Sequence, residues 1–275
     1  KAAEALHITQ PAVSQHIRYI EEYYQTRLFT FQGKKPVLTE AGEYLLHAFT
    51  TLSHDQVYLK EQLLSMQKKE PALIFGATLT IGEYVMPRFL IEYQTRHPDT
   101  VLTMITANTH ELLDRISDGE IDFAIVEGYF DKTQYDYLTF SSEPYIAVAG
   151  TPLFEDCRPR SLSELLDQKL IVREPGSGTR EILEKHLEAR NLSIHDFSGV
   201  SEIGNIPALK AVVSAGLGIT FLYRSAAEEE LKNGILFDVT PENFSITHDF
   251  TLIWQKGSMF ASRYRTIFEE WKKKL

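Results

Sequence analysis

The opening of the chain places a proline at the joint between two helical segments, a pattern typical of a helix-turn-helix. A short apolar segment precedes Thr9, which can cap a second helix, and Pro11, which suits the first turn of that helix. In the second segment Val13, Ile17 and Ile20 recur at spacings of four and three, so they share one apolar face. We therefore expect two helices that meet at a tight turn.

The opposite face of the second helix is polar and carries Gln10, Ser14, Gln15 and Arg18. Glutamine can bond the adenine edge in the major groove of DNA, arginine can bond guanine or a phosphate, and serine can do either. Recognition helices make such contacts with their N-terminal turns. The pattern predicts a DNA-reading helix. The alternative, from this face alone, is an ordinary amphipathic helix with a solvated side.

The residues after this helix are typical of a wing that touches the DNA backbone. Leu28 and Phe29 are apolar, a basic turn follows at residues 33–36, and Val37 with Leu38 predicts a short strand. Lysines in such a turn are suited to phosphate contacts. The predicted DNA-contacting residues are Thr9, Gln10, Pro11, Ser14, Gln15, Arg18, Lys34 and Lys35.

The motifs AAxxLxITQPAVSQHIxxIE, LF and VLTEAG together resemble the N-terminal winged helix-turn-helix domain of LysR-type transcriptional regulators. The resemblance assigns residues 1–42 to DNA binding. The family usually continues Leu-Phe with an acidic residue and an arginine, whereas Thr30 and Phe31 stand here. Because the chain starts inside the second helix of that domain and not with methionine, the resemblance implies an N-terminally truncated sequence.

The formal charge of -10 does not exclude nucleic acid, because the acidic residues are unevenly distributed. Residues 1–36 hold five basic and three acidic residues, whereas residues 71–275 hold 20 basic and 30 acidic residues. Only a local basic surface must face the phosphates. The length of 275 residues suits two or three domains.

Cysteine usage and hydropathy predict a cytoplasmic protein without a membrane segment. The single cysteine, Cys157, excludes an internal disulfide and a cysteine-based metal cluster, and predicts a reduced thiol. The chain has no apolar run of the length that spans a bilayer and no charged-then-apolar leader.

Residues 39–70 predict one long linker helix followed by a hinge. Thr39 is a suitable N-cap, and no proline follows before Pro71. Apolar residues at spacings of four and three form a heptad seam, which favours self-association into a homodimer that engages two half-sites. The alternative is packing of this helix on its own domain. The seam comprises Leu45, Phe49, Leu52, Gln56, Leu59, Leu63 and Met66.

After Pro71 short apolar strands alternate with helices, which predicts an α/β domain with a parallel sheet. Strands are expected at residues 72–77, 101–107, 122–126, 145–150, 170–172, 199–203, 219–222 and 250–254, and helices at 81–96, 110–118, from about 179, 207–215 and 260–273. The order predicts two lobes. Lobe I is residues 71–146 with 248–275, and lobe II is residues 147–247.

The same region is similar to the effector-binding domain of LysR-type regulators, whose fold is related to type 2 periplasmic binding proteins. The segments that carry this resemblance are GATLTIGEYVMPRFL, IxDGEIDFAIVEG, EPGSGTRE and NIPALKAVVSAGLGITFL. It implies a small-molecule effector in the cleft between the lobes, and a dimer that pairs into a tetramer through these domains.

The predicted effector site lies where a helix starts in each lobe. Thr78 and Thr80 follow the first strand, and Ser177 with Thr179 begins a helix in lobe II. Free backbone N–H groups and the helix dipole at such ends favour an anion. The alternative is simple helix capping by these hydroxyls. Arg180 could clamp a carboxylate or pair with Glu184, four residues later.

Further candidates sit at the carboxyl ends of strands, where open α/β sheets bind ligands. The predicted effector-binding residues are Thr78, Thr80, Asn108, Gly128, Ser177, Gly178, Thr179, Gly204 and Asn205.

No catalytic, metal or cofactor motif accompanies these residues. Ser177 lies in no nucleophile-elbow pattern, and the nine histidines show no HxxxH spacing. We therefore predict a non-enzymatic, LysR-type regulator of promoter DNA that is controlled by a small, anionic effector, with RNA polymerase as a further partner. The rival hypotheses are a solute-binding receptor without specific DNA affinity and an enzyme that uses the cleft.

Overall fold

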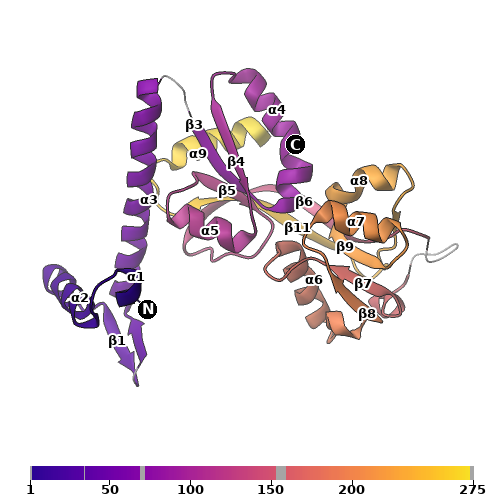
Figure 1. Ribbon diagram of the computed structural model, residues 1–275, viewed down its shortest axis with the longest axis horizontal. Helices are drawn as coiled ribbons and strands as arrows, with labels where there is room; N and C mark the ends of the chain where they lie inside the picture. Colours follow the sequence, from indigo (N-terminus) through magenta and orange to yellow (C-terminus); the bar gives the residue numbers. More distant parts are fainter. Residues whose placement is uncertain (1, 34, 69–71, 153–158, 273–275) are drawn as a thin grey trace. The chain divides into compact units, whose positions relative to one another are not determined.

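The computed structural model describes residues 2–33, 35–68, 72–152 and 159–272 (Figure 1). The chain forms two compact units, Lys1–Ser53 and His54–Leu275, and the division falls inside one long helix. Cys157, Lys34 and the expected hinge at residues 69–71 lie outside the described residues. No helix among the described residues is long and apolar enough to cross a bilayer.

The first unit is a helix-turn-helix followed by a β-hairpin. Its elements are α1 (Ala2–Ala5), α2 (Gln10–Tyr24), β1 (Phe29–Gln32), β2 (Lys35–Leu38) and the first half of α3 (Glu40–Lys68). Thr9 caps α2 by accepting a hydrogen bond from the Ala12 amide at 3.4 Å, and Pro11 lies in the first turn, as predicted. The apolar face of α2, with Val13, Ile17 and Ile20, is half-buried.

The wing is a two-stranded antiparallel hairpin that starts earlier than expected. Phe29 pairs with Leu38, and Gln32 pairs with Lys35. Lys35 therefore lies on a strand, whereas the sequence analysis placed it in the turn. The reason is that the hairpin turn needs only two residues, and Gly33 supplies the positive φ of 65° that such turns use.

Helix α3 begins at the predicted cap and presents two different faces. The Thr39 hydroxyl accepts a hydrogen bond from the Gly42 amide at 3.0 Å. Within the second unit, Asp55 is buried and contacts Ser258 and Met259 just before helix α9 (Ala261–Lys272), and Tyr58 is buried against Tyr264 of α9. Four apolar residues of the predicted seam are exposed in the single chain: Phe49, Leu52, Leu59 and Leu63.

The second unit is built on one mixed sheet with the strand order β4-β3-β5-β11-β6-β9-β7-β8, and β10 pairs with β6. Its strands are β3 (Ala72–Ala77), β4 (Val101–Thr106), β5 (Phe123–Val126), β6 (Tyr135–Ala149), β7 (Lys169–Val172), β8 (Gly199–Glu202), β9 (Ile219–Tyr223), β10 (Phe237–Asp238) and β11 (Ile246–Gln255). Its remaining helices are η1 (Ile81–Val85), α4 (Met86–Arg96), α5 (Thr109–Ser117), η2 (Leu162–Leu165), α6 (Gly178–Glu188), η3 (Ile194–Asp196), α7 (Ile206–Ser214) and α8 (Arg224–Lys232).

The expectation of a wholly parallel sheet is wrong. Strands β3, β4 and β5 are parallel, as are β7, β8 and β9, but β11 runs antiparallel to both β5 and β6, and β6 runs antiparallel to β9. The long strands β6 and β11 pair from Tyr145 and Ile246 to Tyr135 and Gln255, so they carry the chain between the lobes in opposite directions. Strand β6 starts at Tyr135, ten residues before the predicted strand.

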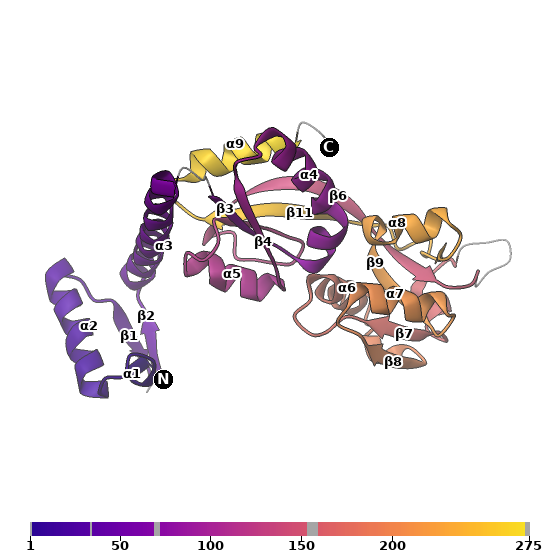
Figure 2. The same ribbon diagram turned by 45° about the horizontal axis from the view of Figure 1, so that its top comes forward.

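Helices cover both faces of the sheet in each lobe (Figures 1 and 2). In lobe I, α4 and α9 pack on one face, where Phe75 contacts Trp271 with ring centroids 5.3 Å apart. Helix α5 packs on the other face, where Leu112 lies in a cluster with Val126. In lobe II, α6 lies on one face, and α7 and α8 lie on the other. Each fully buried large apolar side chain stabilises the fold by about 1.5–3 kcal/mol.

The helix expected at residues 81–96 opens with a π-helical turn, Ile81–Val85, and becomes α-helical at Met86. Pro87 occupies the first turn of α4 and has no amide hydrogen to bond the preceding turn. The π-helical turn Ile81–Val85 lies directly before the position where this hydrogen bond is missing. Helix α8, which the sequence analysis did not predict, is short and largely polar.

Candidate functional site

The predicted DNA-reading face of α2 is open to solvent. Gln10, Ser14, Gln15 and Arg18 are all exposed, and the Ser14 hydroxyl donates to the Gln10 carbonyl at 3.2 Å. Thr9 and Pro11, also exposed, fix the start of the helix. Of the two predicted wing lysines, Lys35 is exposed on β2, and Lys34 is not described. The face is therefore available to a partner as large as duplex DNA.

Glu21, a residue that the sequence analysis did not single out, joins α2 to the wing. Its carboxylate accepts hydrogen bonds from the backbone amides of Leu28 at 2.8 Å and Phe29 at 3.4 Å, and pairs with Arg27 at 3.2 Å. The Leu28 amide is the main reason that the pKa of Glu21 is lowered. These bonds connect helix α2 to the start of the β1–β2 hairpin.

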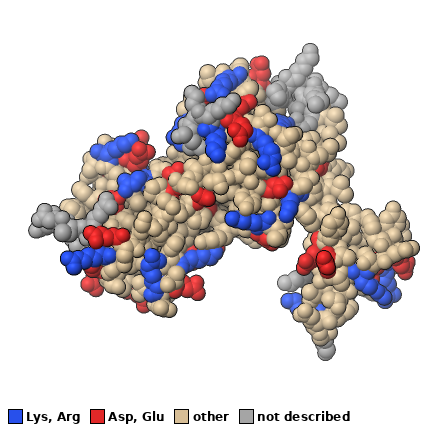
Figure 3. Space-filling model, turned by 180° about the vertical axis from the view of Figure 1, so that it is seen from behind, with Lys and Arg blue, Asp and Glu red and all other residues tan. Residues whose placement is uncertain are grey.

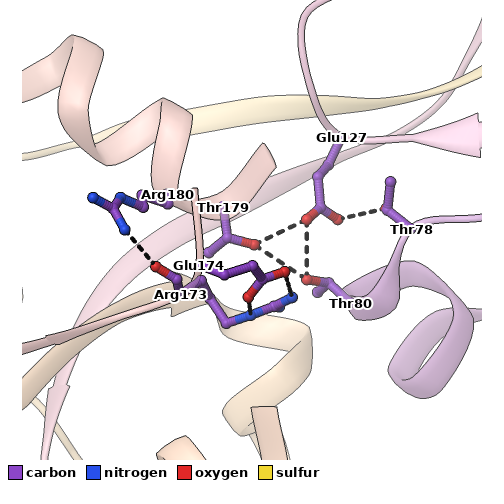
Figure 4. Close-up of polar contacts among 7 residues, drawn as sticks. All are labelled: Thr78, Thr80, Glu127, Arg173, Glu174, Thr179 and Arg180. Carbon is purple, nitrogen blue, oxygen red and sulfur yellow. Dashed lines mark hydrogen bonds and ion pairs between the residues drawn. The ribbon is translucent and has the colours of Figure 1, made fainter. Parts of the chain in front are cut away.

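In the second unit, the predicted threonines from both lobes converge on one carboxylate (Figure 4). Glu127 follows strand β5, and its Oε2 accepts a hydrogen bond from Thr78 at 2.9 Å. Its Oε1 accepts from Thr80 at 3.2 Å and from Thr179 at 2.9 Å. The hydroxyls of Thr80 and Thr179 also lie 3.3 Å apart. We call Thr78, Thr80 and Thr179 the threonine cluster.

Glu127 is almost completely buried, with 2 % of its surface exposed. Burial raises the pKa of its carboxyl, whereas the hydrogen bonds from Thr179, Thr78 and Thr80 and the charge of Arg173 lower it; the net shift is upward. A buried carboxylate is costly unless hydrogen bonds compensate for its lost hydration, and the threonine cluster supplies them.

The two lobes touch beside this carboxylate through a pair of glycines. A methyl group at Gly178 would lie 2.8 Å from Cγ of Glu127 and 3.0 Å from the Gly128 amide nitrogen. Only a residue without a side chain fits such an approach. The Tyr145 hydroxyl donates to the Thr179 carbonyl at 2.8 Å, which fixes the start of α6 against β6.

The prediction of free amides at an anion site is wrong for Thr78. Its amide donates to the Ile125 carbonyl at 3.1 Å, because the chain continues in sheet-like contact beyond β3. The side chains of Thr80 and Ser177 do not cap the helices that follow them. The Thr80 hydroxyl donates its hydrogen bond to Glu127 instead. The anion that these residues hold in the structure is the chain's own carboxylate.

Several other predicted effector residues have structural roles. Asn108 caps α5 by accepting from Glu111 at 2.9 Å, and Asn205 caps α7 by accepting from Ala208 at 2.9 Å. A methyl group at Gly204 would lie 3.2 Å from Oε2 of Glu174. For the two asparagines the capping alternative therefore accounts for the side chain.

Arg180 is engaged in ion pairs and does not point a free guanidinium at the threonine cluster. It contacts Glu184 at 2.8 Å and Glu202 at 2.9 Å, and donates to the Arg173 carbonyl at 3.0 Å. Arg173 forms a two-point pair with Glu174 at 2.9 and 2.8 Å (Figure 4). The salt-bridge alternative for Arg180 is confirmed.

Next to the threonine cluster a cleft of about 360 Å³ opens between the lobes. Its lining comprises Thr109, His110, Leu113, Tyr129, Pro175, Gly176, Arg180, Glu181 and Glu184. The Thr109 hydroxyl is buried without a hydrogen-bond partner, and it would lie 2.4 Å from a methyl group at Gly128. The volume suits a small metabolite.

Glu127 is a residue of the candidate site that the sequence analysis did not single out. It stands in IDFAIVEG directly after four buried residues of β5, at the carboxyl end of that strand. Ligands of open α/β sheets bind at the carboxyl ends of strands, which is why Gly128 was predicted, and Glu127 lies at the same end of β5. Among the described residues, no group of three or more metal-ligating side chains comes together.

Comparison with known protein families gives two matches that together cover nearly the whole chain. Residues 67–274 match the family described as the LysR substrate binding domain. Residues 1–43 match the family described as the bacterial regulatory helix-turn-helix protein, lysR family.

Curated relatives align along almost the full length. The chain is 31% identical over 273 residues to the RuBisCO operon transcriptional regulator of Acidithiobacillus ferrooxidans, covering 98% of this chain and 86% of the relative. It is 28% identical over 271 residues to the HTH-type transcriptional activator CmpR of Synechocystis, covering 98% of this chain and 88% of CmpR.

Solved structures share the fold. A hydrogen-peroxide-bound OxyR mutant from Corynebacterium glutamicum aligns with a TM-score of 0.67 at 23% identity, over 99% of this chain and 86% of that one. The regulatory domain of Synechocystis CcmR in complex with 2-phosphoglycolate (2-PG) aligns with a TM-score of 0.66 at 20% identity, over 74% of this chain and 96% of that domain.

Proposed function

Because the chain belongs to the LysR family of bacterial transcriptional regulators, we propose that α2 reads promoter DNA and that a small anionic metabolite between the lobes alters this contact. The chain carries a DNA-binding domain and an effector-binding domain, and the proteins of this family are regulators and not enzymes. The open polar face of α2 is the observation that carries the proposal.

For DNA, the proposed base-reading residues are Gln10, Ser14, Gln15 and Arg18, whose side chains stand on one exposed face of a helix. Lys35 contacts a phosphate from the wing, together with Lys34. The acidity of the chain does not oppose this, because residues 1–36 hold five basic and three acidic residues and the acidic excess lies in residues 71–275. On the face of the second unit seen in Figure 3, acidic and basic side chains are intermingled.

For assembly, we propose that helix 39–70 pairs with its counterpart in a second copy and that effector domains pair dimers into tetramers. The support is the row of exposed apolar side chains on α3: Leu52 is 63% exposed, Leu59 is 44% exposed and Leu63 is 54% exposed. A two-fold axis through this helix places two recognition helices on two half-sites. RNA polymerase is then a further partner on the promoter.

For the effector, we propose a small anion bound between the lobes at the threonine cluster and the adjoining cleft. Three hydroxyl groups from two lobes already coordinate a carboxylate there. A relative of the same fold, CcmR, was solved with 2-PG in its regulatory domain. Binding must favour one arrangement of the DNA-binding parts over another by a few kcal/mol to switch promoter contacts.

A gel-shift titration on the DNA beside the protein's own gene tests DNA recognition. We expect sequence-specific retardation whose affinity falls steeply with added salt, because cationic contacts to phosphates release counterions. Retardation that is absent, or equal on unrelated DNA, would favour the rival solute-binding receptor.

A thermal-shift panel tests the effector class. It contains 2-phosphoglycolate, sulfate, small carboxylates, and neutral and cationic amino acids. A ligand that binds only the folded state raises the melting temperature, and we expect anions to do so. Stabilisation by cationic compounds alone would contradict an anionic effector.

A further inference from the structure

Glu127 occupies the place that the sequence analysis assigns to the anionic group of an effector. Its two carboxylate oxygens accept three hydroxyl hydrogen bonds, at 2.9, 3.2 and 2.9 Å. Two donors come from lobe I and one from lobe II, so the carboxylate bridges the cleft as a bound anion would (Figure 4). The threonine cluster is therefore satisfied without any ligand.

We infer that Glu127 is a built-in competitor of the anionic effector, which binds the threonine cluster only when the Glu127 carboxylate withdraws from those hydroxyls or is neutralised. This inference rests on the proposed function, since it assumes an anion between the lobes. Glu127 would then set both the affinity of the protein for that anion and the pH dependence of this affinity.

The same carboxylate fastens the two lobes to each other. Thr179 from α6 donates to the oxygen that also accepts from Thr80, and Gly178 lies against the side chain of Glu127. Withdrawal of the carboxylate breaks the bond from Thr179 and leaves the direct contact of Thr80 and Thr179 at 3.3 Å. Exchange of Glu127 for an effector therefore changes a contact across the cleft.

The cations that flank this place offset the repulsion between Glu127 and an incoming anion only in part, because each is paired with another carboxylate; the charge of Arg173 still lowers the pKa of Glu127. Arg173 is paired with Glu174, Arg180 with Glu184 and Glu202, and Lys185 with Glu181 at 3.2 Å. A ligand anion gains hydroxyl bonds at the threonine cluster but meets a like charge in the same place. Like charges sharing one site raise the pKa of one of them strongly.

This repulsion couples anion binding to proton uptake. The charged or titratable groups that interact with Glu127 are Arg173, Tyr145 and Tyr223. Burial raises the pKa of both tyrosines well above their ordinary value, so they stay neutral. The pKa of Glu127 is already raised, and a bound anion raises it further. Affinity therefore increases as the pH falls, by at most about tenfold per pH unit.

The decisive variant is Glu127→Gln, which keeps the shape of the side chain and removes its charge. The probe is sulfate, which stays doubly charged over the tested range, and its binding to the full chain is measured by calorimetry between about pH 5 and 8. At the upper end of this pH range we expect the variant to bind sulfate at least about tenfold more tightly than the wild type. A tenfold change in affinity corresponds to the free energy of a pKa shift of about one unit. The gain shrinks as the pH falls.

The matched control is Glu188→Gln, which removes an exposed carboxylate of α6 that lies outside both the cleft lining and the threonine cluster. We expect it to change sulfate affinity by less than about threefold, because an exposed charge is screened by solvent. It should also retain the pH dependence of the wild type. An equal gain from Glu188→Gln and Glu127→Gln would show that sulfate affinity follows the net charge of the protein, and it would overturn the inference.

A measurement on the wild type alone guards against a variant that does not fold. Binding enthalpies in buffers of different ionisation enthalpy count the protons taken up with sulfate, and we expect a positive fraction of one proton.

The inference is also overturned by no proton uptake by the wild type, by equal or weaker sulfate binding by Glu127→Gln, or by no sulfate binding by either protein. Tighter binding of a cationic amine to the wild type than to Glu127→Gln also overturns it. Specific DNA retardation is measured on the same samples. Its persistence alongside any of these results shows that the inference has failed while DNA recognition by this chain stands.

Discussion

Replacing Asp55 by alanine should loosen the attachment of the linker helix to the effector-binding domain. Asp55 lies on α3, is 9% exposed, and its carboxylate accepts hydrogen bonds from the Ser258 hydroxyl at 2.6 Å and the Met259 amide at 2.9 Å. Both donors precede α9, which starts at Ala261. One side chain of the linker therefore holds the start of a helix of lobe I.

The expected loss follows from these two bonds. A hydrogen bond to a charged group contributes about 1.5–3 kcal/mol, and two that share one carboxylate are not additive. We expect Asp55→Ala to lower the free energy of unfolding of the second unit by about 2–3 kcal/mol. Asp55→Asn keeps one acceptor oxygen and should lose about half as much.

Tryptophan fluorescence during urea denaturation measures this loss selectively. Trp254 and Trp271 are the two tryptophans of the chain, and both are buried in the core of the second unit. The control is Asp114→Ala, whose side chain is 68% exposed and which should change stability by less than about 0.5 kcal/mol. An Asp55→Ala midpoint indistinguishable from that of Asp114→Ala would refute the reasoning.

The remaining predictions concern DNA reading, acid stability and lobe contact. Gln15→Ala and Arg18→Ala should each weaken specific DNA binding by about 1–3 kcal/mol and leave binding to unrelated DNA nearly unchanged, as measured by gel shift; equal losses on both DNAs would contradict base reading. The pKa of Glu21 is lowered in the folded state, so its stabilising effect is present above its ordinary pKa of 4.5 and is lost as the pH falls through the lower value. Glu21→Gln should therefore flatten the acid unfolding curve followed by circular dichroism. Superimposable curves for the variant and the wild type would contradict this. Gly178→Ala should destabilise the second unit by more than about 1 kcal/mol, because its methyl group would lie 2.8 Å from Glu127. In the same fluorescence assay Gly199→Ala should be tolerated, because its methyl group would have its nearest neighbour at 3.9 Å. Equal urea midpoints for the two variants would contradict the close contact between the lobes.

Local features of the fold were predictable from the sequence because their causes are local. Thr9 and Pro11 start α2, and Thr39 starts α3, through bonds to residues at most three or four positions away. The extent of β6 was not predictable in the same way. Between Tyr135 and Tyr145 its side chains are partly exposed or exposed except for the buried Phe140, so this part lacks the continuous apolar run that identifies the buried residues 145–149.

The candidate site was predictable in its residues but not in its arrangement. Thr78, Thr80 and Thr179 were identified from helix starts, and the structure brings them together. The carboxylate between them depends on contacts over 49, 47 and 52 residues of sequence, which no local pattern encodes. The antiparallel pairing of β6 with β11 is equally a property of the whole sheet.

The central claim is that the exposed face of α2 is the surface that reads the promoter, and a structure of the protein bound to DNA from beside its own gene tests it most directly. The account predicts α2 in the major groove, with Gln15 and Arg18 within hydrogen-bond distance of base edges, about 3 Å. A complex in which this face of α2 points away from the duplex would contradict the account.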